Sequence, residues 1–169
     1  KKKSRHHVQL MGSGTILLEV IKAAQMLEED YSITSDIWSV TSFNELRRDG
    51  LAIERHNALH PDEKAQECYV TAQLKDKEGP VIAATDYMRI YADQIRPYVP
   101  NRYVTLGTDG YGRSDTRERL RHFFEVDAKF IVLAALNALV AEGTIDKSKV
   151  TDAIKRYSIN PDKLDPVTH

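Results

Sequence analysis

The sequence predicts a single α/β domain of three layers, with a mainly parallel, mixed sheet flanked by helices. Short apolar, β-branched runs alternate along the chain with segments of helical periodicity. In addition, glycines and helix-capping residues stand where a strand gives way to a helix. The expected strands are residues 8–11, 36–41, 81–85 and 103–106. The run 81–85 is almost wholly apolar, which is typical of a strand buried on both faces.

Apolar residues at helical spacing predict the helices between these strands. The expected helices are residues 16–27, 42–53, 67–74, 88–95, 116–124, 128–140 and 147–157. Ser42 with Glu45 forms a capping box at the start of the second helix. Gly50 is expected to interrupt or end that helix, because glycine is a poor helix former.

Capping residues also define the three C-terminal helices. Asp115 is expected to cap the helix at 116–124, with Glu118 reaching back to the cap's own N–H. Asp127 and Asp146 are the expected caps of the next two helices, and Gly143 closes the first of these.

The stretch 102–124 joins the last expected strand to a helix through a loop with three glycines, Gly107, Gly110 and Gly112. In open α/β sheets, the corner between a strand's carboxyl end and a helix's amino end is where ligands or partner domains dock. This loop is therefore the first place to look for function.

Composition restricts the classes of protein and partner. The chain has 169 residues, 41% hydrophobic and 29% charged, as is ordinary for a globular protein with one core. A formal net charge of −1 gives no electrostatic case for nucleic acid or an anionic membrane as partner. No apolar run is long enough to span a bilayer. The one cysteine, Cys68, excludes an intramolecular disulfide and suits a reducing, cytoplasmic compartment; it is expected to be a small, semi-buried residue.

Three segments of different character divide the chain. Residues 1–7 are expected to form a basic linker, because they lack the apolar centre of a signal peptide. Residues 8–160 carry the alternating pattern of the α/β domain, and residues 161–169 are expected to be a C-terminal tail.

Two turns are candidate ligand or interface sites. The turn Gly12-Ser13-Gly14 follows a strand and could hold a phosphate on the amides of the next helix. It is not a dinucleotide fingerprint, since Leu17 replaces the third glycine, and it lacks the P-loop lysine. A tight strand-to-helix turn is the simpler interpretation.

The second candidate is the 107–116 loop, from which Asp109, Gly110, Arg113 and Ser114 are taken as ligand or interface residues. Oxygens from Thr108 through Asp115 could hold a cation or a water network, but their spacing is not that of an EF-hand. Arginines at 113, 117, 119 and 121 could bind a phosphate or carboxylate; pairing with acids from elsewhere in the chain is the simpler interpretation.

Several longer motifs occur together in one order. They are residues 8–18 (VQLMGSGTILL), 38–50 (WSVTSFNELRRDG), 84–88 (ATDYM), 106–115 (LGTDGYGRSD), 120–127 (LRHFFEVD) and 165–167 (DPV). Together they resemble the C-terminal domain of the homodimeric, bacterial-type pyruvate dehydrogenase decarboxylating component. More loosely, the chain is similar to the C-terminal domain of transketolase, which is the alternative enzyme.

The resemblance implies a cofactor and partners for a longer protein. Such an enzyme is a homodimer that uses thiamine diphosphate and Mg²⁺ to decarboxylate pyruvate and acetylates a lipoyl group on the dihydrolipoyl acyltransferase component. The partners implied for this domain are its own preceding thiamine-binding domains and the second subunit.

The resemblance assigns no catalytic, cofactor-binding or metal-binding residue to this chain. The family's thiamine motif begins with Gly-Asp-Gly and ends with Asn-Asn; the nearest triplet here is Thr108-Asp-Gly110, and no two asparagines are adjacent. The implied role is structural, dimer-supporting or regulatory, and the domain is expected to be inactive alone. An independent module that binds an anion or regulator is the other open hypothesis.

Overall fold

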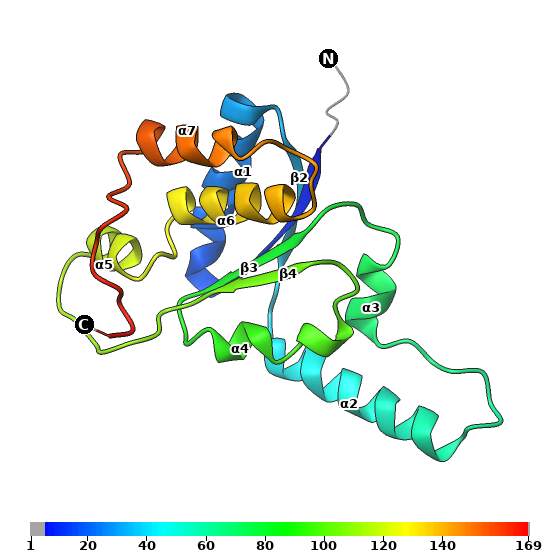
Figure 1. Cartoon of the computed structure of the whole chain (residues 1–169). Coiled ribbons are helices and arrows are strands. Elements are labelled where there is room, and N and C mark those ends of the chain that lie inside the picture. Colours follow the sequence, from blue (N-terminus) through cyan, green and yellow to red (C-terminus); the bar gives the residue numbers. More distant parts are fainter. Residues whose placement is uncertain (1–5, 169) are drawn as a thin grey trace.

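The computed structural model describes residues 6–168, which form a parallel sheet with helices on both faces (Figure 1). The strands are β1 (His7–Ser13), β2 (Thr34–Ser39), β3 (Val81–Thr85) and β4 (Tyr103–Leu106). The helices are η1 (Gly14–Ile16), α1 (Leu17–Tyr31), α2 (Phe43–Leu59), α3 (Tyr69–Leu74), α4 (Ile90–Asp93), η2 (Arg96–Tyr98), α5 (Arg117–Phe123), α6 (Ala128–Ala141) and α7 (Ser148–Arg156). Within residues 6–168 no helix is both long and apolar enough to cross a membrane.

The sheet has the strand order β2-β1-β3-β4. Every pairing between these strands is parallel, so the expected α/β sheet is confirmed, while its expected mixed character is absent from the described residues. The chain leaves β1 toward β2 on one side and returns to β3 on the other. The order of strands therefore reverses between β1 and β3, where Ser13 pairs with Thr85.

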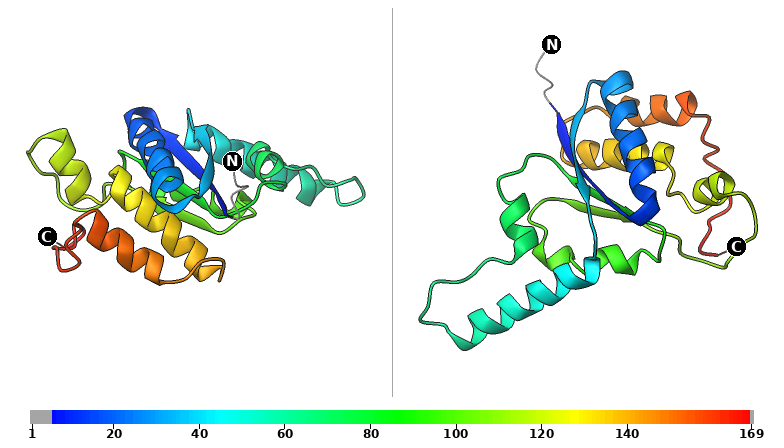
Figure 2. Two further views of the ribbon diagram at one scale, coloured as in Figure 1. Left: turned by 90° about the horizontal axis from the view of Figure 1, so that it is seen from above. Right: turned by 180° about the vertical axis from the view of Figure 1, so that it is seen from behind.

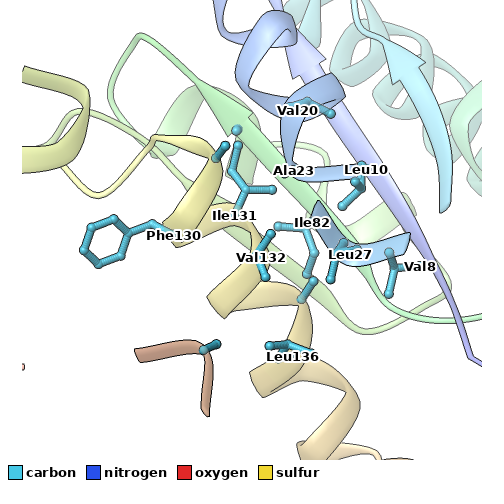
Figure 3. Packing of buried hydrophobic residues seen from close by; sticks show 14 of the residues in the cluster. Val8, Leu10, Val20, Ala23, Leu27, Ile82, Phe130, Ile131, Val132 and Leu136 are labelled. Carbon is cyan, nitrogen blue, oxygen red and sulfur yellow. The ribbon is translucent and has the colours of Figure 1, made fainter. Parts of the chain in front are cut away.

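Two hydrophobic cores lie on the two faces of the sheet, which confirms the three layers (Figure 2). Helices α1, α6 and α7 cover one face; α2, α3 and α4 cover the other. In the first core, Ile82 of β3 packs among residues of α1 and α6 such as Leu27 and Leu136 (Figure 3). In the second core, Met11 and Val81 pack against Phe43 and its neighbours.

Alternation along the central strands explains why both faces are filled. Val8 and Leu10 belong to the first core, whereas Met11 faces the second. Gln9, the residue between Val8 and Leu10 on β1, is fully buried. Its side-chain oxygen accepts a hydrogen bond from Trp38 Nε1 (2.8 Å), and its side-chain nitrogen donates to the carbonyl of Glu78 (3.1 Å). Both ends of its amide are therefore satisfied, as burial requires.

The expected end of the second helix at Gly50 is wrong. Helix α2 continues to Leu59, and Figure 1 shows its far end projecting away from the sheet. Gly50 is buried, and a Cβ at this position would lie 2.3 Å from the ring of Tyr98. The close contact between α2 and the ring of Tyr98 therefore requires a glycine at position 50. This packing outweighs the low helix propensity of glycine.

Other boundaries shift by a few residues. The helix expected at 67–74 begins at Tyr69, after the buried Cys68, whose Sγ lies 3.1 Å from Thr71 Oγ1. The single helix expected at 88–95 is instead the short α4 followed by η2. Such ends are the least determined part of a sequence pattern.

The caps expected from the sequence are only partly correct. Ser42 accepts from the N–H of Glu45, and Asp127 accepts from the N–H of Phe130, so both caps are confirmed. The predicted Asp115 cap is wrong: α5 is capped by Thr116, whose hydroxyl accepts from the N–H of Arg119. Asp115, one residue before this cap, accepts instead from the N–H of Thr116.

Candidate functional site at the carboxyl edge of the sheet

The site lies where β1 and β3 end side by side. Gly14 begins η1 directly after Ser13, and Asp86 follows Thr85. Reversal of the strand order at this point leaves a crevice beyond the carboxyl ends of the strands, which is the usual ligand position in open α/β sheets. The described structure brings the first turn and the late glycine loop to this same edge (Figure 1).

The Gly12-Ser13-Gly14 turn is built for a close approach of strand and helix. A Cβ on Gly12 would lie 2.9 Å from the Cα of Leu17, and Gly14 has φ +68°. Ser13 precedes η1 without a side-chain capping bond. These contacts account for both glycines without a ligand; phosphate binding by the turn stays a prediction.

A buried arginine lies in the crevice. Arg121 of α5 is 8% exposed. Its guanidinium donates to both carboxylate oxygens of Asp86 (3.0 and 3.4 Å), to Glu19 Oε1 (3.2 Å) and to the hydroxyl of Thr15 (3.2 Å). These partners come from η1, α1 and the segment after β3, so one side chain joins three parts of the fold.

The remaining atoms of this network are also paired. Thr15 donates to Asp86 Oδ2 (2.8 Å), and Glu19 Oε2 accepts from the N–H of Ala128 at the start of α6 (3.1 Å). We refer to Thr15, Glu19, Asp86 and Arg121 as the Arg121 cluster. It fixes η1, α1, α5 and α6 relative to one another.

The Arg121 cluster holds one cation, Arg121, and two carboxylates, Asp86 and Glu19, so its formal net charge is −1. Burial disfavours the charged guanidinium, but hydrogen bonding to Asp86 and the charges of Asp86 and Glu19 outweigh this effect and raise the pKa of Arg121. The positive charge is therefore permanent, and two carboxylates of the chain itself face it. The chemistry of the cluster therefore suits a structural role, in which ion pairs hold η1, α1, α5 and α6 together.

The first half of the 107–116 loop is pinned to the segment after β3. The N–H of Thr108 donates to the carbonyl of Tyr87 (2.9 Å), and its hydroxyl donates to the carbonyl of Asp86 (3.0 Å). Asp109 accepts from the N–H of Arg89 (3.3 Å) and pairs with its guanidinium (3.5 Å). Asp109 thus shapes the loop.

The second half of the loop is more open. Gly110 and Arg113 help to line a cavity of about 610 Å³ together with Thr15, Asp86 and Arg121, whereas Ser114 lines a separate hollow of about 460 Å³. The guanidinium of Arg113 lies 4.3 Å from the ring centroid of Phe123. Because Arg113 lies beside a cavity, anion binding by this loop stays a prediction.

The described residues give no support to a cation site in the loop. No three His, Cys, Asp or Glu side chains between residues 6 and 168 are grouped so as to hold a metal ion. The carboxylates of Asp109 and Asp115 are bonded to main-chain N–H groups, which accounts for them as turn-forming residues.

Reasoning from the sequence did not single out Thr15, Glu19 or Asp86, and treated Arg121 only as one of a group of arginines. The pairing of that group with acids is confirmed for Arg121, although its side chain is buried. The sequence feature that could have indicated this cluster is Asp86, a carboxylate directly after a wholly buried strand.

Comparison with known proteins assigns the fold to a family. The family of the transketolase-like TK C-terminal domain matches residues 1–127. The pyruvate dehydrogenase E1 component of Pseudomonas aeruginosa is 57% identical over 168 residues, covering 99% of this chain and 19% of that protein. The corresponding Escherichia coli K12 protein is 52% identical over 164 residues, covering 96% of this chain and 18% of that protein.

A solved structure shares the fold at low identity. It is described as a split gene transketolase, inactive beta4 tetramer, and superposes with a TM-score of 0.55 and 18% identity, covering 82% of this chain and 41% of that one. The chain spans about a fifth of the length of the curated relatives it matches. The resemblance seen in the sequence is thus confirmed: the chain belongs to the transketolase-like TK C-terminal domain family, and its sequence is similar to pyruvate dehydrogenase E1 components.

Proposed function

We propose that this chain is the C-terminal domain of a homodimeric enzyme that uses thiamine diphosphate and Mg²⁺ to decarboxylate pyruvate in the cytoplasm. In this proposal the enzyme then acetylates the lipoyl group of a dihydrolipoyl acyltransferase component. The observation that carries the proposal is 57% identity over 99% of the chain to a pyruvate dehydrogenase E1 component. The E1 components named above favour this assignment over a transketolase, which remains the alternative.

Within that enzyme we assign the domain a structural, dimer-supporting role and no chemical step. Among residues 6–168 no three His, Cys, Asp or Glu side chains are grouped so as to hold Mg²⁺, and the first half of the 107–116 loop is tied to the segment after β3. The Arg121 cluster supports this role, since its ion pairs and hydrogen bonds connect helices of this chain to one another.

Exposed apolar side chains support a packing role. Tyr87 and Met88, between β3 and α4, and Ile90 and Tyr91, at the start of α4, are all exposed. Tyrosine, methionine and arginine are enriched at interfaces, and exposed apolar side chains gathered in residues 87–91 are typical of a surface that another domain covers. We propose that this segment contacts the thiamine-binding domains or the second subunit.

The test compares the full-length enzyme with the same enzyme lacking this domain. Sedimentation measures the dimer, and pyruvate decarboxylation with thiamine diphosphate and Mg²⁺ measures activity. Loss of dimer or activity on removal, with no turnover by this chain alone, is expected. Turnover by the isolated chain, or an unaffected truncated enzyme, would contradict the proposal.

Two surface variants sharpen this test. Ile90→Lys in the full-length enzyme is expected to weaken packing of the domain and lower the melting temperature. Leu59→Lys, at the end of α2, is the matched control because Leu59 and Ile90 are equally exposed, at 59% and 60%. In the isolated chain both changes should leave the melting temperature unaltered.

A second candidate function is anion or regulator binding by the 107–116 loop, favoured by the cavity beside Arg113. Pyrophosphate, acetyl-CoA and sulfate are titrated while the amide resonances of residues 107–116 are followed by NMR. Shifts that saturate, and that are lost in Arg113→Met, would support binding. Unchanged resonances with all three would remove this function.

A further inference from the structure

We propose that the C-terminal segment 160–168, here called the strap, holds the 107–116 loop and the end of α5 in place. Figure 1 shows the segment, in red, running past α5 toward the loop. Its chain is anchored at intervals: the Lys163 side chain is largely buried and Pro166 is buried, whereas Leu164 between them is exposed. The proposal concerns the motion of this chain and does not depend on the proposed enzyme function.

The first anchor is Lys163, whose ammonium caps the end of α5. Its Nζ donates to the carbonyl of Phe123 (2.9 Å) and pairs with Glu125 Oε1 (2.9 Å), and its side chain is 16% exposed. Phe123 is the last residue of α5, so its carbonyl has no partner within the helix. A cation at this end of a helix is also favoured by the helix dipole.

The second anchor is a contact between the main chains of loop and strap. A Cβ on Gly110 would lie 1.9 Å from the carbonyl oxygen of Pro166, and Gly110 has φ +112°. Only glycine permits both this conformation and this approach. The strap therefore touches the loop at Gly110 and the end of α5 at Phe123, on either side of the intervening chain.

The ring of Phe123 connects the two anchors. Arg113 from the loop lies 4.3 Å from its centroid, and Lys163 Nζ from the strap lies 5.5 Å from the same centroid. Each is within the range of a cation–π contact. Residues 111–116 are exposed, and the strap contacts the chain on both sides of them, at Gly110 and at Phe123.

The experiment measures ¹⁵N order parameters of the loop in the 169-residue chain and in Lys163→Met. Residues 110–115 are expected to be rigid in the unmodified chain, with values near ~0.85, and to fall below ~0.6 in the variant. Trypsin should cut after Arg113 about tenfold faster. Lys155→Met, on an exposed face of α7, is the matched control and should change neither measurement. Equal order parameters in Lys163→Met and the unmodified chain, or a loop that is already flexible in the latter, would overturn the proposal.

A second pair of variants addresses the other anchor and does not alter Lys163. Gly110→Ala should loosen residues 164–168 as well as the loop, because the new methyl group displaces Pro166. Gly112→Ala in the same loop is the control, since a Cβ there meets no atom within 4 Å. Loosening of the loop by Gly110→Ala with an unaffected strap would show that the two segments are not coupled and would also overturn the proposal.

Discussion

Arg121 and Asp86 form a two-point ion pair across the carboxyl edge of the sheet, with Nη2–Oδ2 at 3.0 Å and Nε–Oδ1 at 3.4 Å. Asp86 follows the central strand β3, and Arg121 belongs to a helix that begins 31 residues later, at Arg117. The pair thus ties the late helices to the centre of the sheet.

Replacing Arg121 by Met is expected to destabilise the chain by about 3 kcal/mol, because it leaves Asp86 and Glu19 together without their cation. Urea unfolding followed by circular dichroism measures the change. Arg119→Met, at a largely exposed position on the same helix, should alter the free energy of unfolding by no more than ~0.5 kcal/mol. Equal effects of the two substitutions would contradict a structural role for the Arg121 cluster.

Gly50→Ala is expected to destabilise the chain by about 1 kcal/mol. Overpacking against the ring of Tyr98 opposes folding by roughly 2 kcal/mol, and the better helix propensity of alanine returns about 1 kcal/mol. In a Tyr98→Ala background the clash is absent, so Gly50→Ala should become stabilising. A double-mutant cycle measured by urea unfolding gives this coupling; additive effects would show that the ring is not the reason for the glycine.

Stability should fall in alkaline solution through Tyr31. Burial, together with hydrogen bonding to Asp152, raises the pKa of Tyr31 from 10.0 to about 12. The folded chain holds this phenol proton more tightly than the unfolded chain. Its contribution is therefore complete below pH 10 and is lost as the pH rises toward 12. Burial raises the pKa of Tyr157 as well, with the same sign.

Urea midpoints between pH 8 and pH 11.5 measure this loss. Tyr31→Phe should reduce the fall in stability over that range, and Tyr111→Phe, in the exposed loop, is the control. An identical pH profile for Tyr31→Phe and the unmodified chain would disprove the assignment to Tyr31.

Asp127→Ala should destabilise the chain by roughly 1–2 kcal/mol, because one carboxylate oxygen caps α6 at Phe130 and the other pairs with His122 Nδ1 (2.9 Å). Asp127→Asn keeps a capping oxygen and should recover much of that loss in thermal unfolding. Asp162→Ala, on the exposed strap, serves as the control. If the Ala and Asn variants are equally destabilised, the cap is not the source of the effect.

Local signals in the sequence were reliable where the residue and its partner are close along the chain. The Ser42 and Asp127 caps need partners only three residues away, and both formed. Asp115 failed as a cap because Thr116, its neighbour, competes for the same helix start. Gly50 was misjudged for a different reason: its partner, Tyr98, is 48 residues distant, and no local pattern indicates that contact.

The sequence alone determined the α/β class, the four strands and the family, because alternating apolar runs, turn glycines and ordered motifs are properties of neighbouring residues. It also located both candidate turns. Only the tertiary structure decided what occupies the corner between them. Arg121, Asp86, Glu19 and Thr15 are brought together from positions up to 106 residues apart, and the buried guanidinium of Arg121 then pairs with two carboxylates of the chain. The strap on the glycine loop was hidden in the same way, since a lysine and a proline near the C-terminus acquire a role only when the fold places them against Phe123 and Gly110.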